Sequence, residues 1–377
     1  MRVLAVSGIW PPDVGGPASH TPELADFLQR RGHGVEVVVT ADAPPAPESY
    51  PVRFVSRRLP VGVRHAAVAS LIARRARAND VVYVTSMLGR GSLGAALARR
   101  PVVVKLVSDD AFERARRRGL FAGSLDEFQR YEGGFRLRAL RLARNAALRR
   151  VDRLVCPSGY LASFAVAWGV PEERVTVLSN PAPELPPLEA RDALRARLQL
   201  RRPTLAFAGR LTRAKALEVA LEALRRVPDV DLVLAGEGPE RAALEREAAR
   251  LGLDGRVRFL GAQPRRAVLE LFHAADAAIL SSAWENFPHS LVEALAAGAP
   301  VIATAVGGVT EIVRDGENGL LVAPGDAAGL AAAVARLLGD PVLQERLRAA
   351  ASPSVEHLRA EHVYGRLERI LLDAAGV

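Results

Sequence analysis

Two glutamates are the residues of this sequence best suited to chemistry: Glu285 and Glu293, eight positions apart. Glu285 lies with Asn286, Phe287 and Pro288 in a segment that favours a loop, and Glu293 is expected one turn into the helix that follows. A carboxylate accepts hydrogen bonds from two neighbouring hydroxyls at once. The free N–H groups and the dipole of a helix start favour an anion such as phosphate. The pattern therefore predicts a site for a sugar joined to a phosphate.

Two cations bracket a second turn, Arg210 and Lys215, after the apolar run Thr204–Gly209. The run has the pattern of a strand that ends in a glycine, and a helix is expected to start after it. Two cations at the end of a strand can neutralise a diphosphate leaving group. Two solvated charges beside a helix are the alternative, and the residues alone leave both open.

Glycines mark two further turns. Gly15 and Gly16 lie between a strand-like run, Val3–Ser7, and a helical one. A glycine pair there lets the backbone approach a ligand and aims helix N–H groups at it, although an ordinary strand-to-helix turn has the same composition. Gly236 ends a second strand-like run, and Arg241 stands where a dinucleotide fingerprint would have its third glycine. The second turn is therefore not a G-x-G-x-x-G site.

Short apolar runs alternate with helical patterns along the chain, which predicts an α/β fold of parallel sheets with helices on both faces. The strand-like runs are Val3–Ser7, Val35–Thr40, Val81–Thr85, Val102–Val107, Leu154–Pro157, Thr204–Gly209, Leu232–Gly236, Val257–Leu260, Ala277–Ser281 and Val301–Thr304. A proline-rich segment, Asn180–Pro187, predicts a linker. We predict two doubly wound domains, 1–180 and 188–350, and a last helix within 355–377. Ligands of such sheets bind at the carboxyl ends of the strands, so we expect the site in a cleft between the domains.

Composition excludes several classes of protein. The chain has 377 residues, 49% of them hydrophobic, which is enough for two or three domains with large cores. The longest apolar candidate for a membrane span, Ala294–Val309, is broken by glycines and a proline. The single cysteine, Cys156, excludes a disulfide framework and a cysteine-based metal site. The first residues read as a buried strand and not as a signal peptide, so we expect a cytoplasmic protein.

Positive charge is concentrated in the first half of the chain. The net charge is +9, and residues 1–180 carry 27 Lys and Arg against 16 Asp and Glu. This imbalance predicts an anionic partner. The segment Phe112–Arg153 interleaves arginines with apolar residues, so it can lie at the inner face of an anionic membrane or bind a lipid-phosphate acceptor. A solvated helix face is the alternative. We expect no nucleic-acid partner, because no recognised module is present.

These segments together resemble the family-4-type (GT4) retaining glycosyltransferases, which have the GT-B fold. The run from Glu285 to Ala303 is similar to the family's E-x7-E motif, E-G-F-G-L-x-x-x-E-A-M-A-x-G-x-P-V-I-A. Gly209, Arg210 and Lys215 match its G-R-x4-K-G pattern, with Ala216 in place of the last glycine. The matching segments are 8–35, 204–220, 232–240 and 281–320.

The resemblance implies an acceptor-binding domain over 1–180, a nucleotide-sugar-binding domain over 188–350, and a final helix, 355–377, that packs back on the first domain. It implies transfer of a sugar from a UDP- or GDP-sugar to a hydroxyl acceptor, with retention, in glycan or glycolipid biosynthesis. The residues that it places on the donor are Gly15, Gly16, Arg210, Lys215, Gly236, Glu285, Asn286, Phe287, Pro288 and Glu293. Among these, Glu285 is expected to hold sugar hydroxyls and Glu293 the ribose, while Arg210 and Lys215 hold the diphosphate.

One departure from the family concerns its T-x-H-D segment. This chain has Lys105-Leu-Val-Ser-Asp109-Asp110 there and no histidine. Asp109 is a candidate catalytic residue that would bind sugar or acceptor hydroxyls, as could Asp110, and Lys105 is expected to take over part of the histidine's role. A cap for the helix that starts near Ala111 is the alternative for the aspartates, and both stay open.

No metal and no cofactor are expected. Asp229-Val-Asp231 resembles a metal-binding D-x-D triplet, but such triplets are common and this one precedes a strand. The resemblance implies that Arg210 and Lys215 replace a cation, with the nucleotide sugar as co-substrate. The missing histidine leaves an alternative function, a non-catalytic nucleotide-sugar-binding or membrane-associated GT-B protein. A phosphorylase would need a pyridoxal lysine, and Lys105 and Lys215, the two lysines of the chain, lack a suitable context.

Overall fold

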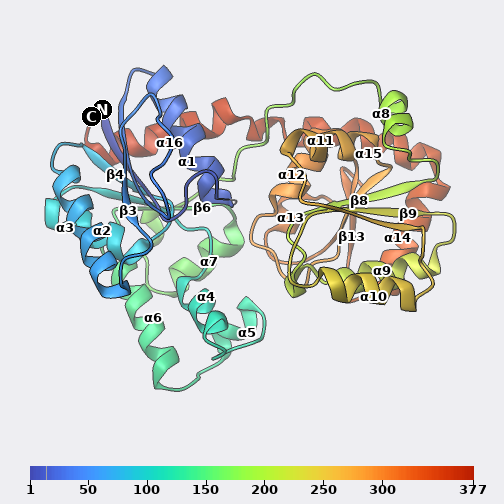
Figure 1. Ribbon diagram of the computed structural model, residues 1–377, viewed down its shortest axis with the longest axis horizontal. Helices are drawn as coiled ribbons and strands as arrows, with labels where there is room; N and C mark the ends of the chain where they lie inside the picture. The colour runs from blue at the N-terminus through green and yellow to red at the C-terminus, as the bar shows by residue number, and fades with distance from the viewer. Residues whose placement is uncertain (14) are drawn as a thin grey trace. The chain divides into compact units, whose positions relative to one another are not determined.

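The computed structural model describes residues 1–13 and 15–377, which divide into two compact units. The first contains Met1–Ser179 and Val363–Val377, and the second contains Asn180–His362. Each unit is built on one parallel sheet with helices packed against it (Figure 1). The predicted α/β class with two doubly wound, Rossmann-like domains is confirmed.

The first sheet has seven strands in the order β3-β2-β1-β4-β5-β6-β7. Their bounds are β1 (Arg2–Ser7), β2 (Gly34–Ala41), β3 (Val52–Ser56), β4 (Val81–Val84), β5 (Val102–Lys105), β6 (Arg153–Cys156) and β7 (Val175–Val177). The central strands are buried along almost their whole length, as expected where helices cover both faces. The strand order reverses between β1 and β4, the kind of switch point at which such sheets bind ligands.

Helices connect these strands. They are α1 (Gly16–Arg30), α2 (Val61–Ala76), α3 (Leu88–Ala98), α4 (Asp110–Arg117), α5 (Leu125–Arg130), α6 (Phe135–Leu148), α7 (Gly159–Ala167) and the short 3-10 helix η1 (Glu172–Arg174). Local sequence explains several starts. A capping box of Ser124 and Glu127 begins α5, and the Ser158 hydroxyl accepts from the Leu161 N–H at the start of α7.

The last helix of the chain, α16 (Ala360–Ala375), belongs to the first unit from Val363 onward. The Tyr364 hydroxyl donates to Glu23 Oε2 on α1 at 2.9 Å. His33, in the turn after α1, lies with Nε2 2.6 Å from Glu368 Oε1. The C-terminal helix therefore packs against α1, the first helix of the chain.

The second sheet has six strands in the order β10-β9-β8-β11-β12-β13. Their bounds are β8 (Thr204–Ala208), β9 (Asp231–Ala235), β10 (Val257–Gly261), β11 (Ala277–Leu280), β12 (Val301–Thr304) and β13 (Gly319–Val322). The helices of this unit are α8 (Arg191–Arg197), α9 (Leu217–Arg226), α10 (Arg241–Arg250), α11 (Arg265–Ala274), α12 (His289–Ala296), α13 (Val309–Ile312), α14 (Ala327–Gly339) and α15 (Pro341–Ser354), with 3-10 turns η2 (Arg213–Lys215) and η3 (Glu356–Leu358). In Figure 1, α11 and α12 cover one face of the sheet and α9 and α10 the other.

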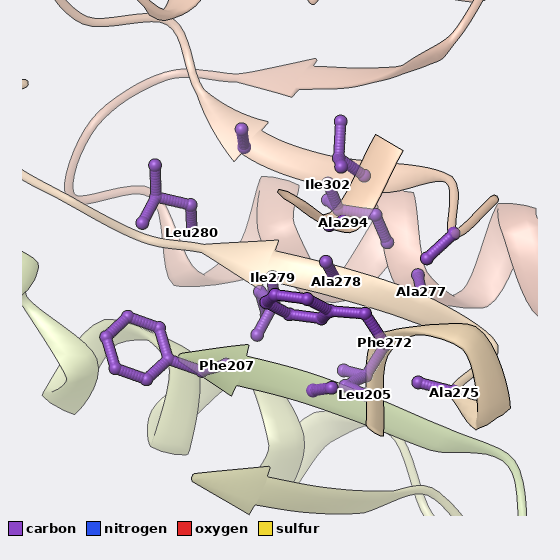
Figure 2. Packing of buried hydrophobic residues seen from close by; sticks show 14 of the residues in the cluster. Leu205, Phe207, Phe272, Ala275, Ala277, Ala278, Ile279, Leu280, Ala294 and Ile302 are labelled. Atoms are coloured by element: carbon purple, nitrogen blue, oxygen red, sulfur yellow. The ribbon is translucent and has the colours of Figure 1, made fainter. Parts of the chain in front are cut away.

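The core of the second unit lies between the sheet and its helices. Figure 2 shows Phe207 of β8 and Ile279 of β11 beside Phe272 of α11, all buried. Alanines fill the closest approaches, for example Ala277 and Ala278 on β11. Burying each large apolar side chain stabilises the fold by about 1.5–3 kcal/mol, so this core holds the ends of β8 and β11 rigidly side by side.

None of the helices in the described ranges is both long and apolar enough to cross a membrane.

Candidate active site

Lys215 and Glu285, two of the predicted site residues, are in direct contact in the second unit. Lys215 Nζ lies 2.5 Å from Glu285 Oε1, and the two side chains are only 19% and 10% exposed. The Ser282 hydroxyl donates to the same carboxylate oxygen at 2.7 Å. A carboxylate offers about four acceptor positions, and both donors address Oε1. The Lys215–Glu285 pair is thus a half-buried ion pair, less screened by solvent than a surface pair.

The backbone around Lys215 is fixed by the loop that carries Glu285. The Ser281 hydroxyl, at the end of β11, donates to the carbonyls of Lys215 and Ala216, both at 3.0 Å. The Ala283 N–H donates to the Ala214 carbonyl at 2.9 Å. Since β8 and β11 are neighbours in the sheet, these bonds join the turns that follow their carboxyl ends. The geometry of the ion pair is therefore set by main chain as well as by side chains.

Ala216 adopts a left-handed backbone conformation, with φ 45° and ψ 44°, where η2 meets α9. Such a conformation favours glycine, because a Cβ crowds the following carbonyl. This is the position at which the related pattern has glycine. The substitution by alanine keeps the backbone shape, and it leaves local strain directly beside Lys215.

Gly236 allows the backbones of two turns, those after β8 and β9, to pack directly against each other. A Cβ at Gly236 would lie 1.8 Å from the carbonyl oxygen of Gly209, so no other residue fits without movement. The Gly209 N–H donates to the Ala235 carbonyl at 3.0 Å, which joins the turns after β8 and β9. This packing positions the start of the segment that carries Arg210. Arg210 itself is exposed and forms no ion pair within the described residues.

Glu293 lies on α12, facing a cation from the preceding helix. Its Oε1 is 3.6 Å from Arg265 Nε, and its side chain is 19% exposed. Helix α12 begins at His289, and its N-cap residue, Pro288, provides no side-chain hydrogen bond. In the first turn, the Leu291 N–H donates to the Pro288 carbonyl at 3.2 Å, and the dipole of such a helix start favours an anion. His289 Nε2 lies 3.1 Å from the side-chain nitrogen of Asn180.

The loop between Glu285 and α12 is mostly inside the protein. Asn286 and Phe287 are each 8% exposed, as is Glu285, and Pro288 is buried. The Gly308 N–H donates to the Glu285 carbonyl at 3.3 Å. The loop is therefore held inside the fold, where its burial fixes the position of the Glu285 carboxylate beside Lys215.

In the first unit, Gly15 and Gly16 lie in the loop after β1, where α1 begins. Gly15 is the N-cap of α1 with φ 155°, and a Cβ there would come within 2.9 Å of Ile9 Cδ1. Asp13 stabilises the preceding turn, because it accepts from the Trp10 N–H at 3.2 Å and forms an ion pair with Arg57. The Arg57 hydrogen bond lowers the pKa of Asp13. The loop thus presents a helix start at the carboxyl edge of the first sheet.

Asp109, predicted as a catalytic residue, has its side chain engaged by groups of the fold. Its side chain is fully buried. One oxygen accepts from the Ala111 and Phe112 N–H groups, and the other lies 2.5 Å from Arg144 Nη1. These contacts are those of a helix cap, because the carboxylate binds the first N–H groups of α4 and the buried Arg144. Asp110 lies beside Arg114, at 3.3 Å.

A buried polar cluster includes Lys105, which lies in the segment where the related family has its T-x-H-D histidine. Lys105 Nζ lies 3.5 Å from His20 Nδ1, and His20 Nε2 lies 2.8 Å from the Tyr83 hydroxyl. Burial lowers the pKa of Lys105 to about 7. His20 was not among the predicted site residues, although it ends the glycine-rich segment that begins α1.

Ser281 and Ser282 were also missed as site residues. Their signal is a pair of hydroxyls at the end of an apolar strand, directly before the glutamate loop. The Asp229 segment, by contrast, lies in a tight turn, with φ 61° at Asp229, and Asp231 is 4.0 Å from Arg202. In the described ranges, no three His, Cys, Asp or Glu side chains gather as metal ligands would.

Known proteins resemble this chain along its whole length. A family model described as Glycosyl transferase 4-like domain matches residues 15–181, and one described as Glycosyl transferases group 1 matches residues 191–352. The second range includes Lys215, Glu285 and Glu293. Glycogen synthase of Mycobacterium tuberculosis is 32% identical over 381 residues, which cover 93% of this chain and 89% of that protein.

Two further comparisons bear on the fold and the chemistry. A D-inositol 3-phosphate glycosyltransferase of Nocardia farcinica is 36% identical over 222 residues, 55% of this chain and 48% of that protein. The crystal structure of Anabaena Alr3699/HepE in complex with UDP-glucose superposes with a TM-score of 0.80 at 22% identity, covering 99% of this chain and 100% of that one. At this identity the superposition establishes the shared fold.

Proposed function

This chain belongs to the family-4 glycosyltransferases, with the GT-B fold, and we propose that it is a retaining enzyme that needs no metal ion. It would transfer a sugar from a UDP- or GDP-sugar to a hydroxyl acceptor. The observation that carries the proposal is the half-buried contact of Lys215 with Glu285. This contact holds an ammonium, suited to a diphosphate, against a carboxylate, suited to sugar hydroxyls.

In the proposed reaction, Lys215 and Arg210 stabilise the leaving diphosphate. Lys215 has three N–H donors, so Nζ can keep its bond to Glu285 and still donate to a phosphate oxygen. Arg210 is exposed at the same turn, and its guanidinium fits phosphate oxygens bidentately. Cations held in place before the reaction stabilise charge as it develops on the leaving group.

Retention follows from attack on the face that the diphosphate leaves. The acceptor hydroxyl oxygen bonds to the anomeric carbon as the bond from that carbon to the diphosphate oxygen breaks. The hydroxyl proton passes to a departing phosphate oxygen, so no side chain has to act as nucleophile. Glu285 would accept from hydroxyls of the transferred sugar and fix its orientation, and Glu293 would accept from the ribose hydroxyls.

Relatives support the choice of substrates. Alr3699/HepE was crystallised with UDP-glucose, which favours UDP-glucose as the first donor to test. The glycogen synthase relative supports a role in glycan biosynthesis, and the D-inositol 3-phosphate glycosyltransferase supports an anionic hydroxyl acceptor. We propose cytoplasmic action, with peripheral membrane contact only if the acceptor is lipid-linked.

The experiment measures release of UDP or GDP from a panel of nucleotide sugars, with EDTA present and with or without candidate acceptors. We expect turnover with one donor base, and NMR of the product should show the anomeric configuration of the donor. Lys215→Ala should lower turnover by about 10²–10³-fold. Arg213→Ala is the matched control, because Arg213 lies in the same 3-10 turn with its side chain 87% exposed.

The rival function, binding without catalysis, predicts a different result. Nucleotide sugars would then raise the thermal midpoint of the protein, yet no nucleotide would be released with any acceptor. Equal turnover of the wild type and Lys215→Ala would reject the assigned roles, and a requirement for a divalent ion would reject the metal-free mechanism.

A further inference from the structure

A basic pocket of about 470 Å³ lies in the first unit, and none of its lining residues is among those assigned above to the donor. Its lining is dominated by four arginines and a histidine. The residues are His65, Met87, Gly89, Arg90, Arg114, Arg117 and Arg118. We call this cavity the arginine pocket. Its volume is in the range of cavities that hold small-molecule ligands, about 300–1,000 Å³.

The arginine pocket lies at the edge of the sheet where ligands bind. His65 is on α2, which follows β3, and Arg90 is on α3, which follows β4. Arg114 and Arg117 are on α4, which follows β5. Three connections that leave the carboxyl ends of three strands therefore supply its cations. In doubly wound sheets this is the edge at which substrates bind.

Positive charge predominates among the groups that line the arginine pocket. No carboxylate is among its lining residues in the part of the chain that the structure describes, and the nearest ion pair joins Arg114 to Asp110 at 3.3 Å. Arg117 Nε donates to the main-chain carbonyl of Glu113 at 3.3 Å. Burial, together with the charges of Arg114 and Arg64, lowers the pKa of Arg90 against an opposing effect of Asp110. Like charges gathered around a cavity repel one another unless an anion joins them.

We propose that the arginine pocket binds a phosphate group of the acceptor, so that the acceptor of this enzyme is a phosphorylated or otherwise phosphate-bearing hydroxyl compound. That the bound compound is the acceptor of a glycosyl transfer rests on the proposed function. That the pocket binds phosphate does not depend on it. Guanidinium groups match phosphate oxygens bidentately, and each such bond is charge-assisted. Arg90, which is half-buried, supplies the anchor, and the exposed Arg117 and Arg118 close over the anion.

The first experiment titrates the full-length protein with inorganic phosphate by calorimetry, at constant ionic strength with chloride as the reference anion. The test variant is Arg117→Gln with Arg118→Gln, because both side chains are exposed and their loss should not unfold the protein. The matched control is Arg149→Gln with Arg150→Gln, an equal change of charge on exposed arginines of the same unit. We expect at least tenfold weaker phosphate binding in the test variant and an unchanged affinity in the control.

Two outcomes would overturn the proposal. One is phosphate affinity that is equal in the wild type and in the Arg117/Arg118 variant, or absent from the wild type. The other is phosphate binding that disappears in Lys215→Ala and persists in the Arg117/Arg118 variant, which would place the anion at the candidate donor site. Neither result depends on turnover, so a failure of the proposed function, seen as no nucleotide release, is distinguishable.

A second arm distinguishes a soluble acceptor from a lipid headgroup. Val61 and Val63, on the first turn of α2 before His65, are 61% and 56% exposed and could meet a lipid surface. Sedimentation with vesicles of phosphatidylcholine, with and without 30% phosphatidic acid, gives the answer. Binding to the acidic vesicles that the Arg117/Arg118 variant loses and the control keeps assigns the phosphate to a lipid. Phosphate binding without vesicle binding assigns it to a soluble compound.

Discussion

Lys215 Nζ and Glu285 Oε1, 2.5 Å apart, join two turns that are separated by 70 positions of the chain. Because the ammonium is assigned to the diphosphate and the carboxylate to the sugar, each group also orients the other. We therefore expect their contributions to catalysis to be coupled.

A double-mutant cycle measures this coupling. Lys215→Ala and Glu285→Gln should each lower kcat/KM by about 10²–10³-fold, and the double variant should lose little more than the worse single variant. Groups that act as a unit show such non-additive losses. Circular dichroism controls for folding. Losses that multiply in the double variant would mean that the two side chains act independently, and the proposed bridge would be wrong.

Ala216→Gly should relieve the left-handed strain beside Lys215. The change removes about 1–2 kcal/mol of backbone strain and returns part of it through the greater entropy of glycine in the unfolded chain, about 0.4–1 kcal/mol. We expect a thermal midpoint equal to that of the wild type or a few degrees higher. Ala216→Val is the contrast, because a β-branched residue at φ 45° should lower the midpoint. A clear loss of stability in Ala216→Gly would contradict the account of the strain.

Asp109→Asn should destabilise the protein and should not act on the chemistry. Its loss leaves the Arg144 guanidinium buried without a counter-charge, a change that costs about 3–5 kcal/mol in comparable pairs. Urea unfolding measures this. Asp110→Asn is the control, because its ion pair with Arg114 is exposed and should contribute less than about 1 kcal/mol. A normal unfolding midpoint with low turnover would instead support Asp109 as a catalytic residue.

Lys105→Met should stabilise the protein most at low pH. The pKa of Lys105 is lowered from 10.5 to about 7 in the fold, by burial, against a smaller opposing effect of Glu23. His20 and Tyr83 are the other titratable groups of this cluster. Below pH 7 the folded state holds a buried charge, and the full penalty, on the order of 3–5 kcal/mol, is present.

Between pH 7 and 10.5 the folded state has lost this proton and the unfolded state keeps it, so the stability of the wild type rises with pH. The advantage of Lys105→Met should accordingly shrink over that range and vanish above it. Urea unfolding of both proteins at pH 6, 8 and 9.5 makes the comparison. An advantage that is the same at all three values would show that Lys105 does not titrate in this way.

Sequence patterns predicted the main strands because a buried parallel strand is apolar along its whole length. β1, β8 and β11 lie within one or two residues of their predicted positions. Three strands were not predicted: β3, whose Arg53 and Phe54 are exposed, β7 (Val175–Val177) and β13, which begins at Gly319. Each has at most three or four consecutive apolar residues, so pairing with a neighbouring strand defines it.

The candidate site could be predicted in its composition but not in its contacts. The E-x7-E spacing identified Glu285, and the pair of cations after a strand identified Lys215. No local rule, however, brings two residues that are 70 positions apart within hydrogen-bond distance. Asp109 shows a second limit. Its position fitted both a ligand and a helix cap, and its contact with Arg144, which comes from α6, could not be predicted from the local sequence.

The contacts of α16 with α1 also affect the order in which the two units of the nascent chain can fold. The first unit closes only when Tyr364 and Glu368 reach Glu23 and His33. On the ribosome, residues 1–179 are therefore made first and wait while the whole second unit is translated. At roughly 5–20 residues per second this delay is about 10–40 s. During that time the apolar side of α1 that later contacts Tyr364 is exposed to solvent. We expect it to be a binding site for a chaperone.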